Sequence, residues 1–71
     1  MTSLAEALPA EIKRVRGLQD QYKELRGMPN VIVEPQIMMM EHAIDRAIEA
    51  SASGDVVAML RAYEDLKEYE E

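Results

Sequence analysis

Hydrophobic residues recur every three or four positions through most of this chain, which is the spacing of one face of an α-helix. The pattern predicts three helices, over about residues 9–26, 36–51 and 55–69. The core positions expected in the first and third helices are Ile12, Val15, Leu18, Tyr22 and Leu25, and Val56, Met59, Leu60, Tyr63 and Leu66. A turn of about three residues joins the last two helices, so we expect them to form an antiparallel hairpin with the first helix packed across it. Residues 1–71 then form one all-α, three-helix domain.

Residues typical of helix ends flank these segments. Ser3 has the capping-box spacing to a glutamate, and Pro9 either starts the first helix or kinks a longer one. Gly27 is suited to end that helix. Ser53 or Asp55 is the expected N-cap of the third.

The connector between the first two helices, residues 28–35, holds a Val-Ile-Val triplet between two prolines. Residues that precede proline favour extended backbone, so we expect an extended segment that places Ile32 in the core. Three successive β-branched residues also leave open a two-stranded pairing across a dimer axis.

The second helix is predicted to be apolar over about half of its circumference, although a surface helix needs a stripe only a little wider than about 100°. Its apolar positions are Ile37, Met39, Met40, Ala43, Ile44, Ala47, Ile48 and Ala50. Such a helix needs two partners, and the chain is short of helices to supply both. The excess apolar surface therefore indicates self-association, with a homodimer favoured, or a protein target.

The candidate interface combines the start of this helix with the connector. Its residues are Val31, Ile32, Val33, Met38, Met39, Met40, Ala43 and Ala47. We expect Met38 to be exposed among polar neighbours, as methionines on adaptable binding surfaces are. An alternative is that the first helix of the same chain packs on the low-profile strip formed by Met39, Ala43, Ala47 and Ala50.

Composition narrows the functional classes. A chain of 71 residues without cysteine has neither disulfides nor thiolate metal sites, and oligomerisation is the remaining common means of stabilising so small a core. No membrane span or signal peptide is recognisable, so we expect a cytoplasmic protein. The net charge of −6 divides into +1 for residues 1–27 (five basic, four acidic) and −7 for residues 28–71 (three basic, ten acidic).

Catalytic chemistry is not indicated. The only histidine, His42, shares a helix face with Asp45 and Glu49, which we interpret as solvated surface because a zinc site would need further histidine or cysteine ligands. The serines lie at predicted helix ends, and the glycines are isolated, without a phosphate-binding loop. We therefore expect no catalytic, cofactor-binding or metal-binding residues and a protein that is not an enzyme. The sequence assigns no role to Gly17.

Two other functions remain open. Arg14, Arg16 and Lys23 are candidate contacts for an anionic, nucleotide-type ligand, which an oligomer would have to gather because the two arginines point in different directions. The acidic second half is alternatively a mimic of nucleic acid. Direct binding of nucleic acid is not expected, since it requires a clustered basic face.

The segments LPAEIKRVR and SGDVVAMLRAYEDLKE resemble a group of small, helical phage- and prophage-encoded proteins of uncharacterised function. The middle segment, MPNVIVEPQIMMM, departs from the glycine- and alanine-rich turn of that group. The resemblance implies an accessory protein in the cytoplasm of a bacterial host. Such a protein would bind and modulate or inhibit a host protein, including a component of host defence. The resemblance assigns no functional residue.

Overall fold

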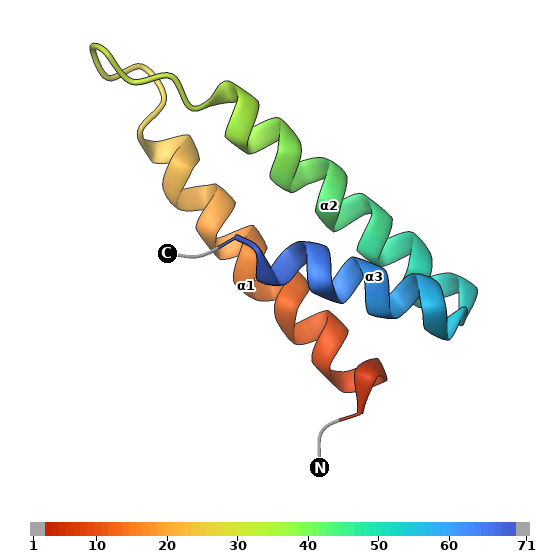
Figure 1. The fold of residues 1–71 in the computed structure, drawn as a ribbon. Helices are drawn as coiled ribbons and strands as arrows, with labels where there is room; N and C mark the ends of the chain where they lie inside the picture. The colour runs from red at the N-terminus through yellow and green to blue at the C-terminus, as the bar shows by residue number, and fades with distance from the viewer. Residues whose placement is uncertain (1–2, 70–71) are drawn as a thin grey trace.

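The computed structural model describes residues 3–69, which form three α-helices: α1 (Leu4–Glu24), α2 (Glu34–Ser53) and α3 (Val56–Lys67) (Figure 1). The described residues contain no strand, and each helix contacts the other two, so the all-α, three-helix prediction is confirmed. The helices α1 and α2 run side by side in opposite directions along the 43 Å length of the molecule. From the far end of α2 the chain turns back as α3, which lies across α1 (Figure 1).

Local capping explains where α1 begins. The Ser3 side-chain oxygen accepts a hydrogen bond from the Glu6 amide at 3.3 Å, as the capping-box spacing predicts. The helix therefore begins at Leu4, and Pro9 lies inside it, a little over one turn from its start. The second helix, α2, begins at Glu34 and has Pro35 in its first turn. Proline is tolerated there because amides of the first turn have no helical hydrogen-bond partner.

Gly54 and Asp55 together end α2 and start α3. Gly54 has a φ of 74°, a left-handed conformation that glycine adopts without strain, and its amide donates to the Ala50 carbonyl at 3.2 Å. The Asp55 carboxylate then accepts from the amides of Val57 and Ala58 at 3.0 and 3.4 Å. Of the two residues expected to cap α3, Asp55 is therefore the N-cap.

All three helices contribute to one core. Its buried residues are Leu8, Val15, Leu18, Met40, Ala43, Ile44, Ala47, Ala50, Met59, Ala62 and Leu66. The wide apolar arc of α2 is largely covered within the chain, because α2 contacts both α1 and α3. The predicted core of α3 is partly wrong: Val56 and Leu60 are at least half exposed, since only the side of α3 that carries Met59, Ala62 and Leu66 reaches the other helices.

The connector between α1 and α2 also differs from its prediction. Ile32 is 85% exposed and Val33 is buried, so the expectation that Ile32 enters the core is wrong. A tight turn explains the change of phase: Asn30 has a φ of 64°, and the Val31 amide donates to the Met28 carbonyl at 3.3 Å. This turn leaves Ile32 directed outward and Val33 directed inward at the start of α2.

The helices differ in length, and this divides the molecule into two regions. At 1.5 Å per residue, the 12 residues of α3 span about 18 Å, whereas the 20 residues of α2 span about 30 Å. Part of the α1–α2 pair therefore extends past the end of α3 (Figure 1). We call residues 18–42, which include the connector, the two-helix end. The remainder of the described residues is the three-helix end.

Candidate interaction surface

The eight residues predicted as an interface divide into two groups. Four of them, Val33, Met40, Ala43 and Ala47, are at most 6% exposed and belong to the interior of the chain, so they are not available to a partner. The other four, Val31, Ile32, Met38 and Met39, are exposed. The structure therefore leaves Val31, Ile32, Met38 and Met39 accessible and assigns the other four residues to packing within the chain.

Helical geometry explains how adjacent methionines separate. Successive residues of an α-helix point about 100° apart, so Met38, Met39 and Met40 leave α2 in three directions. Met40 points to the core with Ile44, one turn later. Met38 is 60% exposed, as predicted, on the side of α2 away from the core, and Met39 is 54% exposed on a flank.

Two residues of the two-helix end join this exposed apolar surface. Leu25, which the sequence places in the core, is 39% exposed just past the end of α1, and Met28 is 51% exposed in the connector. Leu25 continues the apolar stripe of α1, but it lies past the end of α3. The periodicity predicted the side of the helix that Leu25 occupies, but it could not predict that α3 is too short to cover that side.

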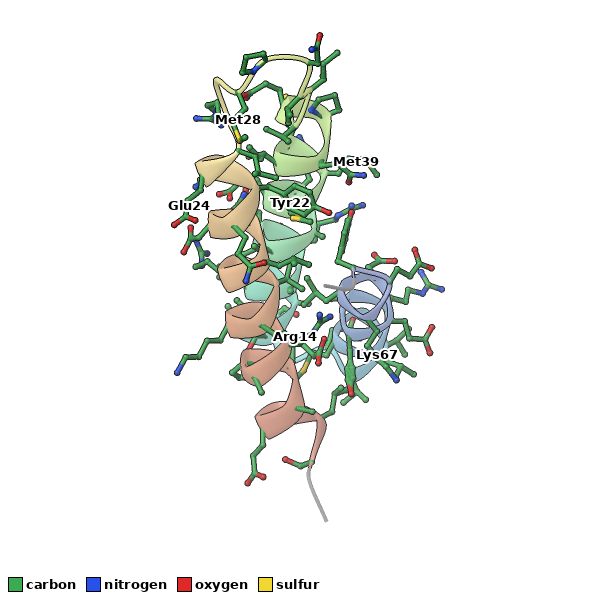
Figure 2. The ribbon with its side chains drawn as sticks, turned by 90° about the vertical axis from the view of Figure 1, so that its left-hand side faces the viewer. Arg14, Tyr22, Glu24, Met28, Met39 and Lys67 are labelled. Atoms are coloured by element: carbon green, nitrogen blue, oxygen red, sulfur yellow. The ribbon has the colours of Figure 1, made fainter. Side chains whose placement is uncertain are left out.

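The apolar side chains at the end of α1 face the direction in which α3 lies. Leu18, Gln21, Tyr22 and Leu25 line a shallow surface hollow of about 220 Å³. They follow Arg14 at intervals of four, seven, eight and eleven residues, which place them on the same side of α1. Arg14 contacts α3 directly, so the hollow lies on the α3 side of the helix, past the point where α3 ends. Figure 2 shows Tyr22 near the top of the molecule, away from Arg14 and Lys67.

Met39 occupies the corresponding position on α2. It precedes Arg46 by seven residues, and Arg46 lines the groove between α2 and α3. Met39 also lines a hollow with Tyr69, the residue that follows the last turn of α3. Met39 on α2 and Leu25 after α1 are therefore both exposed at the two-helix end, where they line separate hollows.

A buried polar side chain links α1 to α2 at the two-helix end. The amide nitrogen of Gln19, a residue only 1% exposed, donates to the Ile37 carbonyl at 3.1 Å and to the Glu41 carboxylate at 2.8 Å. Its Oε1 atom has no hydrogen-bond partner among the described residues. Sequence reasoning missed Gln19, although it lies one turn from Val15 and from Tyr22, within the apolar stripe.

The three cationic side chains proposed to bind an anionic ligand do not lie together. Arg14 donates to the Glu11 carboxylate at 2.9 Å and, with the same Nη2 atom, to the Leu66 carbonyl at 2.9 Å. It therefore binds the last turn of α3, where carbonyl groups lack helical partners and the helix dipole favours a cation. Arg16 and Lys23 are exposed on other parts of α1. Within one chain, the three cations form no common site.

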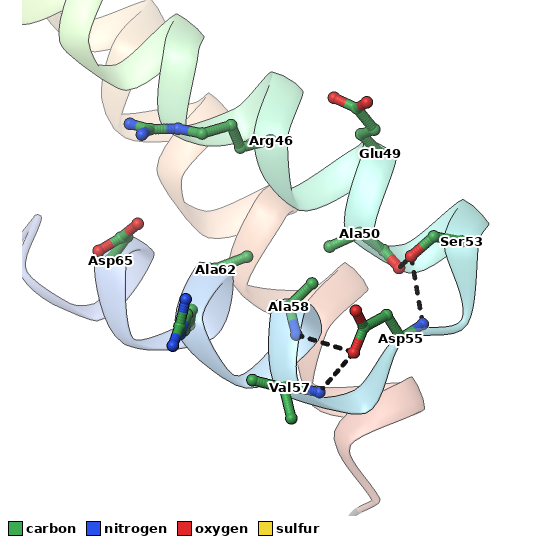
Figure 3. A pocket seen from close by; sticks show the side chains of 10 residues that line it. Arg46, Glu49, Ala50, Ser53, Asp55, Val57, Ala58, Ala62 and Asp65 are labelled. Atoms are coloured by element: carbon green, nitrogen blue, oxygen red, sulfur yellow. Dashed lines mark hydrogen bonds between the residues drawn. The ribbon is translucent and has the colours of Figure 1, made fainter.

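A groove of about 480 Å³ lies between the last turns of α2 and the facing side of α3, starting at the first turn of α3 (Figure 3). Small side chains, including Ala50 and Ala62, lie along it, and its charged groups have both signs, with Arg46 and Asp65 facing it from different helices. The Asp55 carboxylate in the groove is bonded to the first amides of α3. We find there no arrangement of nucleophile, base and orienting group that catalysis would require.

His42 is exposed on α2. Within residues 3–69, no three histidine, cysteine, aspartate or glutamate side chains converge as metal ligands would. In the same part of the chain, no helix has the length and apolar character needed to cross a membrane. Most side-chain hydrogen bonds of the described residues cap a helix or join one helix to another.

We compared the chain with models of protein families, with curated proteins and with solved structures, and none of them matches it.

Proposed function

We propose that this protein is a non-catalytic interaction module, an accessory protein of a phage or prophage that binds and modulates a host protein in the bacterial cytoplasm. The observation that carries the proposal is the 85% exposure of Ile32 at the tip of the two-helix end. Three further exposed apolar residues, Met28, Val31 and Met38, belong to the connector and the first turns of α2. Exposed apolar side chains that lie together in one loop and the helix turns beside it are typical of a contact surface.

Two features restrict the conformations of the tip. The guanidinium of Arg26 pairs with the carboxylate of Glu34 across the connector, with an Nη2–Oε2 distance of 3.2 Å. Pro29 and Pro35 restrict the backbone on both sides of Ile32. A preorganised loop loses less conformational entropy on binding, so more of the contact energy remains as affinity.

The chemistry of the tip suggests the kind of site that it fits. Ile32 would enter an apolar pocket, and the flexible side chains of Met28 and Met38 would adapt to its edges. Arg26 and Glu34 supply one charge of each sign at the rim. The resemblance of LPAEIKRVR and SGDVVAMLRAYEDLKE to small phage proteins supports a host protein, including a component of defence, as the target.

The test is capture of a host protein by the tagged chain and by matched variants. Ile32→Asp combined with Met38→Glu places two charges on the tip, and neither residue is buried, so the fold should persist. We expect one host protein bound by the wild-type chain to be lost at least tenfold with this variant. Val56→Asp, which is 67% exposed at the three-helix end, is the control and should retain it. Equal retention by all three proteins would contradict the proposal.

A further inference from the structure

Two methionines and a histidine of α2 lie within about one turn of each other at the two-helix end. Met38 and Met39 precede His42 by four and three residues, and residues at these spacings are neighbours on a helix surface, with Cβ atoms about 5–6 Å apart. All three side chains are exposed, Met38 to 60% and Met39 to 54%. The proposed function uses Met38 but gives no role to Met39 or His42.

The direction of the side chains brings their donor atoms together. Side chains of an α-helix lean toward its N-terminus, so the His42 imidazole leans over the turn that carries both methionines. Around the helix axis, His42 lies about 40° from Met38 and about 60° from Met39, between the two. Methionine side chains are unbranched and flexible. The imidazole therefore has a thioether within reach on each side.

A shared hollow supports one of these pairings. Met39, labelled in Figure 2, and His42 line the same hollow of about 390 Å³ on the flank of α2. The charged side chains of its lining are Asp45, Glu49 and Arg46, which are two acids and one base and therefore sum to −1. A net negative charge around the hollow favours a cation.

The donor atoms decide the class of cation. Thioether sulfur is a soft ligand that selects Cu(I), and imidazole nitrogen also suits copper. Calcium and magnesium need oxygen ligands, and zinc sites are built from cysteine, histidine and carboxylate groups. Although Asp45 and Glu49 follow His42 on α2, no three histidine, cysteine, aspartate or glutamate side chains within residues 3–69 converge as ligands. The ligand set around His42 is therefore that of a soft cation.

We propose that Met38, Met39 and His42 bind Cu(I) through two thioether sulfurs and one imidazole nitrogen. This inference goes beyond the proposed function and departs from the expectation of no metal-binding residue, which rested on the ligands of zinc. Bonds from a metal to imidazole nitrogen and sulfur are about 2.0–2.3 Å long, so two donors on one ion lie about 4 Å apart. Side chains whose Cβ atoms are about 5–6 Å apart can reach that separation without any change in the helix.

Met28 provides a comparison within the same chain. It is 51% exposed in the connector, nearly as much as Met39, but it lies outside the turn over which the His42 imidazole leans. Exposure alone would make Met28, Met38 and Met39 equivalent toward a soft cation. A site built around His42 distinguishes them, because a cation held by several donors of one protein binds more tightly than one held by a single thioether.

Nuclear magnetic resonance of the purified full chain, labelled with ¹³C in the methionine methyl groups, tests the site. The probe is Ag(I), a soft monovalent cation that is stable to air. At one equivalent we expect the methyl signals of Met38 and Met39 and the ring signals of His42 to shift together, while the methyl signal of Met28 keeps its position. If any of the three residues shows no shift, or if Met28 shifts as much, the proposal is wrong.

Calorimetric titration with Cu(I) itself, in the absence of oxygen, tests the ligands one by one. His42→Ala and Met39→Leu should each weaken Cu(I) binding at least about tenfold, whereas Met28→Leu, the matched control, should bind as the wild type does. All three positions are exposed, so the far-UV circular dichroism should not change. Equal affinities of His42→Ala and Met28→Leu would contradict the site.

Zn(II) separates a soft site from a general affinity for metals. Added at the same concentration as Ag(I), it should leave the methyl signals of Met38 and Met39 in place. A Zn(II) shift equal to that of Ag(I) would argue against thioether selection. None of these measurements involves a host protein, so failure of the metal site and failure of the proposed function are distinguishable.

Discussion

The two ends of this molecule differ in what lies between their helices. At the three-helix end, leucine, isoleucine and alanine side chains such as Leu8, Ile44 and Ala47 are fully buried between three helices. At the two-helix end, a glutamine is buried between two helices, and Ile32, Met38 and Met39 are exposed. Large apolar side chains are exposed at both ends, so the comparison indicates that the third helix, and not the exposed surface, makes the three-helix end the main core.

The largest expected effect separates the two ends by their contribution to stability. Ile44→Ala removes a fully buried side chain from the three-helix end and should lower the free energy of unfolding by about 2–5 kcal/mol. Met39→Ala, at the two-helix end, should change it by less than about 0.5 kcal/mol in dilute solution. Urea unfolding followed by circular dichroism measures both. Similar losses for the two variants would remove the distinction between the ends.

The next effect concerns the polar link inside the two-helix end. Gln19→Ala removes the hydrogen bonds to the Ile37 carbonyl and the Glu41 carboxylate and should cost about 1–3 kcal/mol. Gln21→Ala, on the exposed side of the same helix, is the control and should cost less than about 0.5 kcal/mol. A loss for Gln19→Ala no larger than that for Gln21→Ala would argue against this link.

A smaller effect tests the turn that returns the chain as α3. Asp55→Ala removes the acceptor for two amides at the start of α3 and should cost about 1 kcal/mol. Ser3→Ala removes an acceptor for one amide at 3.3 Å and should cost less. Thermal unfolding of the two variants ranks them. The opposite order would show that capping of α1 contributes more than capping of α3 to the stability of the three-helix end.

The smallest effect has the opposite sign. A Cβ atom added at Gly17 meets no atom within 4 Å, and Gly17 lies inside α1, so Gly17→Ala should stabilise the chain by about 0.5–1 kcal/mol. Gly54→Ala provides the contrast, because its φ of 74° strains any residue with a Cβ, and it should destabilise. Melting temperatures in dilute solution check both signs. A loss of stability for Gly17→Ala would contradict the open space found around a Cβ atom at this position.

Local signals in the sequence predicted most of the fold. Helical periodicity located all three helices, and the caps at Ser3 and Asp55 follow from side chains that bond backbone amides a few residues away. The sequence could not predict which connector residue points inward, because the turn at Asn30 changes the phase between Ile32 and Val33. The helical period of 3.6 residues applies only within a helix, so it cannot predict which side chains point inward after such a turn.

The candidate site was predictable only in part, for a different reason. Met38 could be placed on the surface from the helical wheel, whereas Met40 and Ala43 could not be assigned to the core or the interface before the packing partner was known. Their burial depends on where α1 and α3 lie against α2. The exposure of Leu25 likewise depends on the length of α3 relative to α1 and α2, which is a property of the assembled helices and not of any one segment.

Hydrogen exchange tests the contrast between the two ends most directly. The account predicts that in dilute solution the backbone amides of residues 43–50, in the part of α2 that packs against both other helices, exchange about tenfold or more slowly than those of residues 38–42. Equal protection along α2 would contradict the claim that the three-helix end is the main core.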